Sequence, residues 1–188
     1  MYLSFVGAAP EATFTFARDH WHTEEHVRST GVSHTFPRDN MYLDYFPALA
    51  GTDGVIRGSA GDGRVGAVAR DDIAEVAVAV LLGEGHDGRT YDVTGPEAVT
   101  SYQAAEDLTR VIGRSITYHA ETLEEVYASR ASYGAPGWEV EGWVSSYAAI
   151  APSEMNMVSD TVFELTGHTP ITLTDFLRRY PDSYKHLA

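Results

Sequence analysis

The order of the elements at the start of the chain constrains the fold most. The chain opens with a continuous apolar run from Tyr2 to Val6, as in a strand that is buried on both faces of a parallel sheet. A helical pattern covers Arg18 to Thr30 and stops at Gly31, and Val32 to Phe36 then alternates polar and apolar residues. This order of strand, helix and strand predicts a parallel sheet with a right-handed crossover.

The remaining sequence continues the alternation. Pro37 is expected at a strand end, and Asn40 is expected to cap an aromatic helical turn over Met41 to Ala50. From Glu121 onward the pattern is helical in short pieces. The elements expected between these regions are a short strand within Gly51 to Gly66, a helix over Arg70 to Leu82, a strand over Thr90 to Thr94, a helix over Ser101 to Ile112 between Thr100 and Gly113, and a strand over Ser115 to Tyr118.

Charge and composition exclude several classes of function. The 188 residues include 27 Asp and Glu against 13 Lys and Arg, for a formal charge of −14. Such a chain repels nucleic acid and anionic membranes, so we expect neither as a partner. The absence of Cys excludes disulfides and thiolate zinc sites. No apolar run approaches the ~20 residues of a membrane span, and the N-terminus lacks a signal-peptide pattern, so a soluble cytoplasmic protein is expected.

Gly61 to Gly66 matches the dinucleotide-binding pattern G-x-G-x-x-G. A phosphate site of this kind needs a buried strand before the glycines and a helix directly after them. Here the glycines lie in a glycine-dense loop, and a short apolar segment separates them from the helix that begins at Arg70. A hairpin or a bulge is therefore the preferred interpretation.

His22 to His26 matches H-x-x-E-H, in which two histidines on one helix face bind zinc beside a general-base glutamate. His20 lies nearby, but no third ligand stands in a supporting motif. We therefore expect no metal site and interpret the segment as a solvated helix face. A zinc hydrolase that acts through His22 and His26 is kept as the third functional hypothesis.

Aromatic and polar residues suggest a ligand pocket. Arg38, Asp39 and Asn40 directly follow a predicted strand, and ligands of open α/β sheets bind at the carboxyl ends of strands. Core packing explains any single aromatic residue equally well, but together they could line a cleft for a flat substrate. These aromatic residues are Tyr42, Tyr45, Phe46, Tyr133, Trp138, Trp143 and Tyr147.

Six segments carry a likeness to a known family: Tyr2 to Ala8, Asp19 to Glu25, Thr35 to Tyr42, Ala60 to Arg64, Arg70 to Ala74 and Tyr91 to Pro96. In order and spacing they resemble the NmrA-like branch of the atypical short-chain dehydrogenase/reductases. The likeness runs through essentially the whole chain and is greatest to the NAD(P)H:quinone oxidoreductase-like members of that branch.

The resemblance implies an α/β fold, namely the C-terminal part of a Rossmann-like doubly wound sheet with a small helical substrate-covering region. Residues 1–120 would form the partial Rossmann-like core and residues 121–188 the mostly helical region, both in one structural unit. In this family the first third of the chain supplies the glycine fingerprint and most of the diphosphate site. Met1 falls where the family's fifth strand starts, so the sequence is expected to lack that third.

The resemblance also implies roles for individual residues. Ser4 and His20 are the expected catalytic residues, at the positions of the family's serine and lysine. Phe16 takes the position of the proton-donating tyrosine and cannot donate a proton, which excludes the usual alcohol dehydrogenase mechanism but agrees with quinone reduction. The expected cofactor contacts are Phe5, Val6, Gly7, Pro37, Arg38 and Asn40, and the expected substrate contacts are Tyr42, Tyr45, Tyr133 and Trp138.

By this resemblance the complete protein is an oxidoreductase that uses NADP or NAD and transfers hydride to a quinone or a similar conjugated carbonyl. The 188-residue chain is expected to bind the cofactor weakly or not at all, because the diphosphate amides are missing. The second hypothesis is a non-catalytic NmrA-like domain that binds a small ligand or regulates a partner. An apolar opening strand without one of its neighbours also predicts a homodimer.

Overall fold

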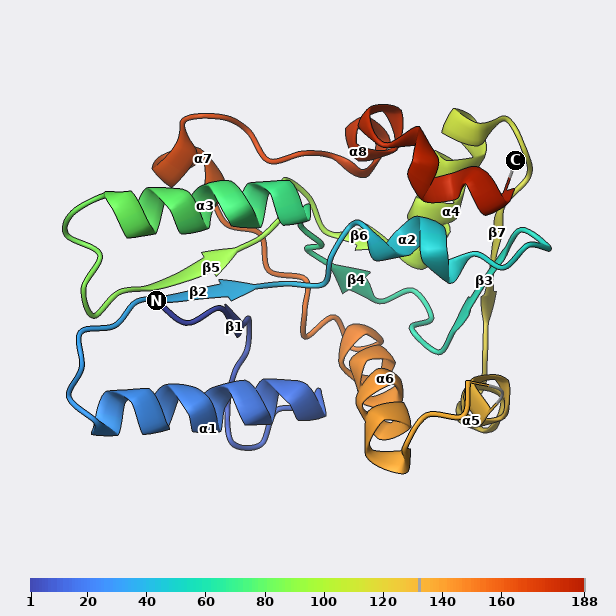
Figure 1. Ribbon diagram of the computed structural model, residues 1–188. Helices are drawn as coiled ribbons and strands as arrows, with labels where there is room; N and C mark the ends of the chain where they lie inside the picture. Colours follow the sequence, from blue (N-terminus) through green and yellow to red (C-terminus); the bar gives the residue numbers. More distant parts are fainter. Residues whose placement is uncertain (132, 188) are drawn as a thin grey trace.

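A computed structural model of the chain describes residues 1–131 and 133–187 (Figure 1). Its largest sheet is parallel and has the order β1, β2, β5, with bounds Ser4–Phe5, Phe36–Asp39 and Thr90–Val93. Helix α1 (Thr15–Ser29) lies along one side of this sheet and helix α3 (Arg70–Leu82) along the other. The predicted order of strand, helix and strand and the α/β class are confirmed.

Neighbouring residues on a strand point to opposite faces of the sheet, and this separates two sets of side chains. Ser4 and Arg38 are register partners and face α1, where both contact Glu24. Phe5 and Asp39 are the next register pair and therefore face the opposite way. At the ends of β1 and β2, the face toward α1 therefore carries two polar residues. The opposite face carries one aromatic and one acidic residue.

Pro37 lies inside β2, where the sequence predicted a strand end. The N–H of Phe36 donates to the carbonyl of Arg89 on the β5 side (3.0 Å), so the alternation of the backbone directs the Pro37 nitrogen toward β1. Proline has no N–H, and β1 therefore lacks a ladder hydrogen bond at this point. The strand expected over Tyr2 to Val6 is accordingly reduced to Ser4–Phe5.

Two short sheets extend the core. β3 (Val55–Gly58) pairs with β7 (Thr117–Ala120) in parallel, and β4 (Arg64–Val65) pairs with β6 (Val99–Thr100) in antiparallel orientation. The glycine segment Gly61 to Gly66 leads into and through β4, so no helix directly follows its glycines. This arrangement supports the hairpin interpretation over a phosphate site.

Close packing explains two of these glycines. A Cβ atom on Gly63 would lie 2.0 Å from the carbonyl oxygen of Ile150, and one on Gly66 would lie 2.0 Å from that of Met157. Both positions therefore require glycine for the approach of another backbone segment. A second match to the same spacing, Gly83 to Gly88, joins α3 to β5 and so connects a helix to a strand, the reverse of the order that binds phosphate.

Helix α4 (Ser101–Ile112) follows its sequence signals closely. The Thr100 hydroxyl accepts a hydrogen bond from the backbone N–H of Gln103 (3.0 Å), and the Gln103 side chain accepts one from the backbone N–H of Thr100 (2.9 Å). This capping box fixes the start of the helix, and Gly113, with a φ of 76°, ends it.

The C-terminal part is a series of short helices, as predicted: α5 (Leu123–Ala131), α6 (Gly137–Ile150), α7 (Thr161–Thr166), α8 (Leu173–Arg179) and the 3-10 segment η1 (Pro181–Leu187). α7 packs against α3 and α8 packs against α4, whereas α6 contacts α1 and α5. Within the described residues, no helix is both long and apolar enough to span a membrane.

Tertiary contacts explain two boundaries that the sequence did not predict. α1 begins at Thr15, before the helical pattern expected from Arg18, and the Thr15 N–H donates to the hydroxyl of Ser145 on α6 (3.1 Å). Asn40 does not cap a helix, since its side-chain amide donates to the carbonyl of Met155 (2.9 Å). The expected helical turn is limited to α2 (Tyr45–Leu49).

Candidate active site

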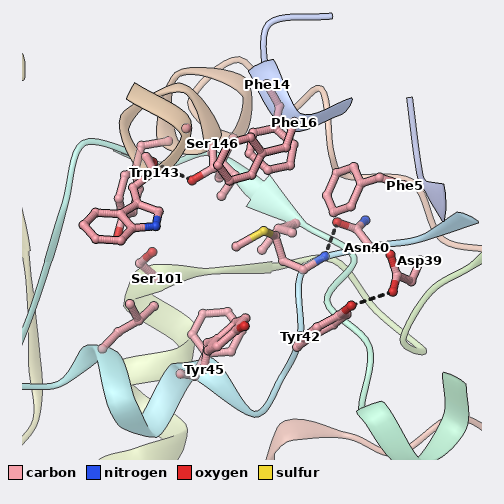
Figure 2. Close-up of a pocket in the computed structure, with 18 of the residues that line it drawn as sticks. Phe5, Phe14, Phe16, Asp39, Asn40, Tyr42, Tyr45, Ser101, Trp143 and Ser146 are labelled. Carbon is pink, nitrogen blue, oxygen red and sulfur yellow. Dashed lines mark hydrogen bonds between the residues drawn. The ribbon is translucent and has the colours of Figure 1, made fainter. Parts of the chain in front are cut away.

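A cavity of about 630 Å³ opens at the carboxyl ends of β1 and β2, where α1, α2 and α6 contribute its walls (Figure 2). This edge is the usual place for ligands in open α/β sheets. The residues that line the cavity include Phe5, Phe14, Phe16, His20, Asp39, Asn40, Tyr42, Tyr45, Arg130, Tyr133, Trp143, Ser146 and Tyr147.

The walls of the cavity are mainly aromatic. Phe14 and Phe16 extend from the start of α1, and the Phe14 ring lies edge-on to Phe5 with 4.9 Å between centroids. Trp143 and Tyr147 line the cavity from α6, and Figure 2 shows Trp143 across the view from Phe5. Aromatic faces separated by such a space favour a flat, apolar ligand.

Asp39 and Tyr42 form a hydrogen-bonded pair in the wall, drawn with a dashed line in Figure 2. The Tyr42 hydroxyl donates to Oδ2 of Asp39 at 2.8 Å, and Asp39 is 3% exposed. Burial raises the pKa of Asp39 to about 6, although the bond from Tyr42 opposes the shift. Burial also raises the pKa of Tyr42, so this hydroxyl keeps its proton at neutral pH. The wall therefore holds a carboxyl group whose pKa burial raises well above that of an exposed aspartate.

His20 lines the same cavity from α1. Its ring stacks on Phe5 with 6.3 Å between centroids, and the Tyr2 hydroxyl lies 2.9 Å from its Nδ1. Burial lowers the pKa of His20 against the opposing effects of Asp19 and Glu24, so the ring is neutral at pH 7. A neutral ring cannot supply the positive charge that a lysine would supply at this position.

The predicted catalytic Ser4 lies outside the cavity. It is fully buried beneath α1 and donates to Oε1 of Glu24 at 2.6 Å. Glu24 also accepts two hydrogen bonds from Arg38, at 2.7 and 2.6 Å, and one from Arg28 at 3.0 Å. Although burial opposes the shift, these donors hold the pKa of Glu24 below its usual value. Ser4 and Arg38 thus belong to a closed ion-pair network that does not face the cavity.

The other predicted cofactor contacts divide in the same way. Phe5 and Asn40 line the cavity, whereas Val6, Gly7 and Pro37 do not. Val6 is buried in the core, Gly7 is exposed in the turn after β1, and Pro37 is buried in β2. The structure therefore brings together two of the six residues expected to contact the cofactor.

Three of the four predicted substrate residues line the cavity, namely Tyr42, Tyr45 and Tyr133. Trp138 does not: its side chain is 68% exposed at the start of α6, and its ring lies 6.3 Å from that of Phe16. Trp143 takes the expected place because it lies further along the same helix, on the side that faces inward.

Arg130 is a lining residue that the sequence did not single out. Its guanidinium donates to Oε2 of Glu121 (2.9 Å), to the Tyr147 hydroxyl (3.0 Å) and to the carbonyl of Arg57 (2.9 Å). Its side chain is 11% exposed. Arg130 therefore places a positive charge, neutralised by Glu121, at the α5 end of the cavity. It is distant from Asp39 in the sequence, although both residues line the same cavity.

The H-x-x-E-H segment has no zinc-site geometry. Glu25 pairs with Arg28 at 2.6 Å, and the ring of His22 packs edge-on against Trp21. Among the residues that the structure describes, no cluster of three or more His, Asp or Glu could hold a metal ion. The zinc hydrolase hypothesis has no support.

Comparison with known proteins gives a consistent group of relatives, although no family model matches the chain. The chain is 28% identical over 183 residues to the NAD(P)H azoreductase of Xenophilus azovorans, with 95% of this chain and 64% of that protein covered. It is 30% identical over 162 residues to quinone oxidoreductase 2 of Escherichia coli, with coverages of 85% and 57%. The chain thus spans less than two thirds of the length of these curated relatives.

Solved structures give the same grouping. An NADPH-dependent quinone oxidoreductase of Escherichia coli, complexed with NADPH, superposes with a TM-score of 0.85 at 28% identity, covering 95% of this chain and 64% of that one. The triphenylmethane reductase of Citrobacter sp., complexed with NADP(H), gives 0.82 at 29% identity, covering 100% and 64%. The regulator NmrA gives 0.72 at 15% identity over 98% of this chain and 64% of that one, which shows a shared fold. The chain belongs to the NmrA-like family.

Proposed function

We propose that this member of the NmrA-like family contributes the nicotinamide and acceptor portion of an NAD(P)H-dependent oxidoreductase that reduces a quinone or a similar flat conjugated carbonyl. The observation that carries this proposal is the aromatic cavity at the carboxyl ends of β1 and β2. The names of the relatives, which include quinone, azo and triphenylmethane reductases, agree with a flat acceptor.

The cavity fits the nicotinamide end of the cofactor. Phe5 offers an aromatic face, and the neutral ring of His20, which stacks on Phe5, adds a polar group at the same end. When bound, the reduced nicotinamide supplies a hydride, and the residues of this chain hold the flat acceptor close to it and exclude water. The described residues contain no glycine-rich turn from a strand into a helix, so we expect the 188-residue chain to bind NADPH weakly.

The test is acceptor binding to the 188-residue chain, with 1,4-naphthoquinone as the probe and isothermal titration calorimetry as the measurement. Trp143→Ala removes an aromatic wall, and we expect it to weaken binding about tenfold. Trp138→Ala is the matched control, since Trp138 is on the same helix but outside the cavity, and it should change affinity less than about twofold. Absence of binding, or equal effects of the two variants, would contradict the proposal.

We also propose a homodimer through the edge strand β1, which pairs only with β2 among the described residues. Met1 and Leu3 beside it are 47% and 37% exposed, and an unpaired apolar edge favours association. Light scattering at micromolar concentration tests this proposal, and a monomer would contradict it. A cytoplasmic location also stays a prediction from the sequence.

A further inference from the structure

The proposed reduction adds a proton as well as a hydride to the acceptor, so it needs an acid that lines the cavity. Phe16 lines the cavity but has no ionisable group. Tyr42 lines the same cavity and carries a hydroxyl bound to a buried carboxyl at 2.8 Å. We propose that Tyr42 is the catalytic acid of this site and that Asp39 is the positioning residue that returns its proton. This inference rests on the proposed function and names the group that completes it.

The geometry of the pair suits this role. The hydrogen bond from Tyr42 holds its hydroxyl oxygen beside the carboxyl group, so a protonated Asp39 can donate to this oxygen and free the Tyr42 proton for an acceptor. Stacking on Tyr45, with 5.6 Å between ring centroids, holds the Tyr42 ring in the wall. Asp39 has a neighbour on each side in the sheet, Phe5 on β1 and Val93 on β5. Both neighbours are apolar and buried, so they offer the carboxylate no compensating charge.

Few charged groups lie close enough to Asp39 to change the pKa of its carboxyl group. His20 from α1 lines the same cavity and is neutral at pH 7. Arg70 of α3, which is bound to Asp44, acts on Tyr42 and lowers its pKa against the larger effect of burial. Arg38, Glu24 and Asp92 lie on the opposite face of the sheet. Protonation of Asp39 is therefore the main change of charge available to the pair near neutral pH.

The proposed step is balanced. A quinone that accepts a hydride from the reduced nicotinamide gains two electrons and one hydrogen, and its carbonyl oxygen then needs a proton. The Tyr42 O–H bond breaks and the new O–H bond forms on the acceptor, while the proton of the neutral Asp39 carboxyl moves to Tyr42. A proton from the solvent returns to Asp39 after the quinol leaves, so one quinone, one reduced cofactor and one proton give one quinol and one oxidised cofactor.

The proposal predicts a proton linkage that does not depend on turnover. A quinone oxygen accepts hydrogen bonds and cannot donate them, so it binds best when Asp39 is neutral and Tyr42 is free to donate to it. Above the pKa of Asp39, the affinity for 1,4-naphthoquinone should therefore fall by up to about tenfold for each pH unit. The chain has no Cys, so this probe cannot alkylate a thiol.

The experiment is calorimetric titration of 1,4-naphthoquinone between pH 6 and pH 8, in two buffers of different ionisation enthalpy. The wild-type chain should take up part of a proton on binding, and Asp39→Asn should bind with no proton uptake and no pH dependence. Tyr42→Phe should weaken binding about tenfold at pH 6, and Tyr45→Phe, the matched control in the stacked ring, should keep the wild-type pH dependence.

The outcomes separate this proposal from the proposed function. Binding that depends on Trp143 but not on pH, with no proton uptake, would overturn the role of Tyr42 and Asp39 and leave the acceptor site intact. Binding by neither the wild-type chain nor its variants would overturn both. A folded Asp39→Asn variant with the wild-type pH profile would also overturn the proposal, because another group would then carry the proton.

Discussion

Two buried carboxylates near the ends of β1 and β2 differ in the charge of the groups that bind them. Glu24 is fully buried and accepts hydrogen bonds from Ser4, Arg28 and Arg38, and its pKa is lowered. Asp39 is almost equally buried, but its side-chain donor is the neutral Tyr42, and its pKa is raised to about 6. Burial is similar at the two sites, and it is the compensating charge that differs.

The difference follows from one step along the strand. Arg38 and Asp39 are consecutive, so their side chains leave β2 on opposite faces. Arg38 donates to Glu24 of α1, whereas Asp39 lines the aromatic cavity. Ion pairs therefore occupy one face of the sheet end, and the other face holds a carboxyl group at the cavity wall whose side-chain donor is neutral.

The largest expected effect is on stability, and it comes from removing the charge of Glu24 in the ion-pair network with Arg38. Glu24→Gln leaves the guanidinium of Arg38, whose side chain is 20% exposed, without its charge partner. Removal of one partner of a buried ion pair costs about 3–5 kcal/mol, so the free energy of unfolding should fall by that amount. Glu25→Gln is the matched control at the next residue, in an exposed pair with Arg28, and it should cost less than about 1 kcal/mol. Urea denaturation measures both, and equal costs would show that the network is not structural.

The second prediction concerns the sign of the pH dependence on the open face. The folded state holds the Asp39 proton more tightly than the unfolded chain, since the pKa rises from 3.8 to about 6. Stability contributed by this group is therefore lost as pH rises between these two values. Asp39→Asn cannot ionise and should remove that loss. The difference in the free energy of unfolding between the variant and the wild type should therefore move in favour of the variant by up to about 3 kcal/mol from pH 3.5 to pH 8.

Differences in free energy of unfolding between wild type and Asp39→Asn across this pH range isolate the group from the other carboxylates. A constant difference from pH 3.5 to pH 8 would contradict the raised pKa. Glu24 has the opposite sign: its contribution is present above its unfolded pKa and is lost as pH falls through its lowered folded value.

The smallest expected effect on stability concerns the packing of the aromatic cavity wall, where two glycines of α6 can be compared. A Cβ atom at Gly142 on α6 would lie 2.1 Å from the ring of Phe16, so Gly142→Ala forces this ring to move and should cost about 1–3 kcal/mol. Gly137 begins the same helix, and a Cβ atom there would have no neighbour within 4 Å, so Gly137→Ala should be neutral or slightly stabilising. Thermal unfolding of both variants compares them, and similar shifts would mean that Phe16 moves freely.

Local signals in the sequence predicted much of the fold. Thr100 and Gly113 define α4 by hydrogen bonds within a few residues of each other, and the periodic helix over Arg70 to Leu82 has the bounds of α3. The strand expected over Val32 to Phe36 instead begins at Phe36, because pairing with β5 extends the strand through Pro37. Pairing between distant strands is not encoded in a local pattern.

The site was less predictable for the same reason. The sequence placed Asp39 after a strand but could not show whether its side chain or that of Arg38 faced the ligand, since a shift of one residue exchanges the two faces. Arg130 joins the cavity through contacts with Glu121 and Arg57 that no local motif indicates. Ser4 was assigned by position in a family pattern, whereas its actual partner, Glu24, lies 20 residues away on α1.

Carbon-13 NMR titration of the side-chain carboxyl groups tests the contrast between Asp39 and Glu24 most directly, with Asp39→Asn used to assign the Asp39 resonance. We predict that Asp39 titrates near 6 while Glu24 titrates below its ordinary value of 4.5. Tyr42→Phe should move the Asp39 midpoint further upward, because the carboxylate loses a donor. An Asp39 midpoint near 3.8, or one that Tyr42→Phe leaves unchanged, would contradict this contrast.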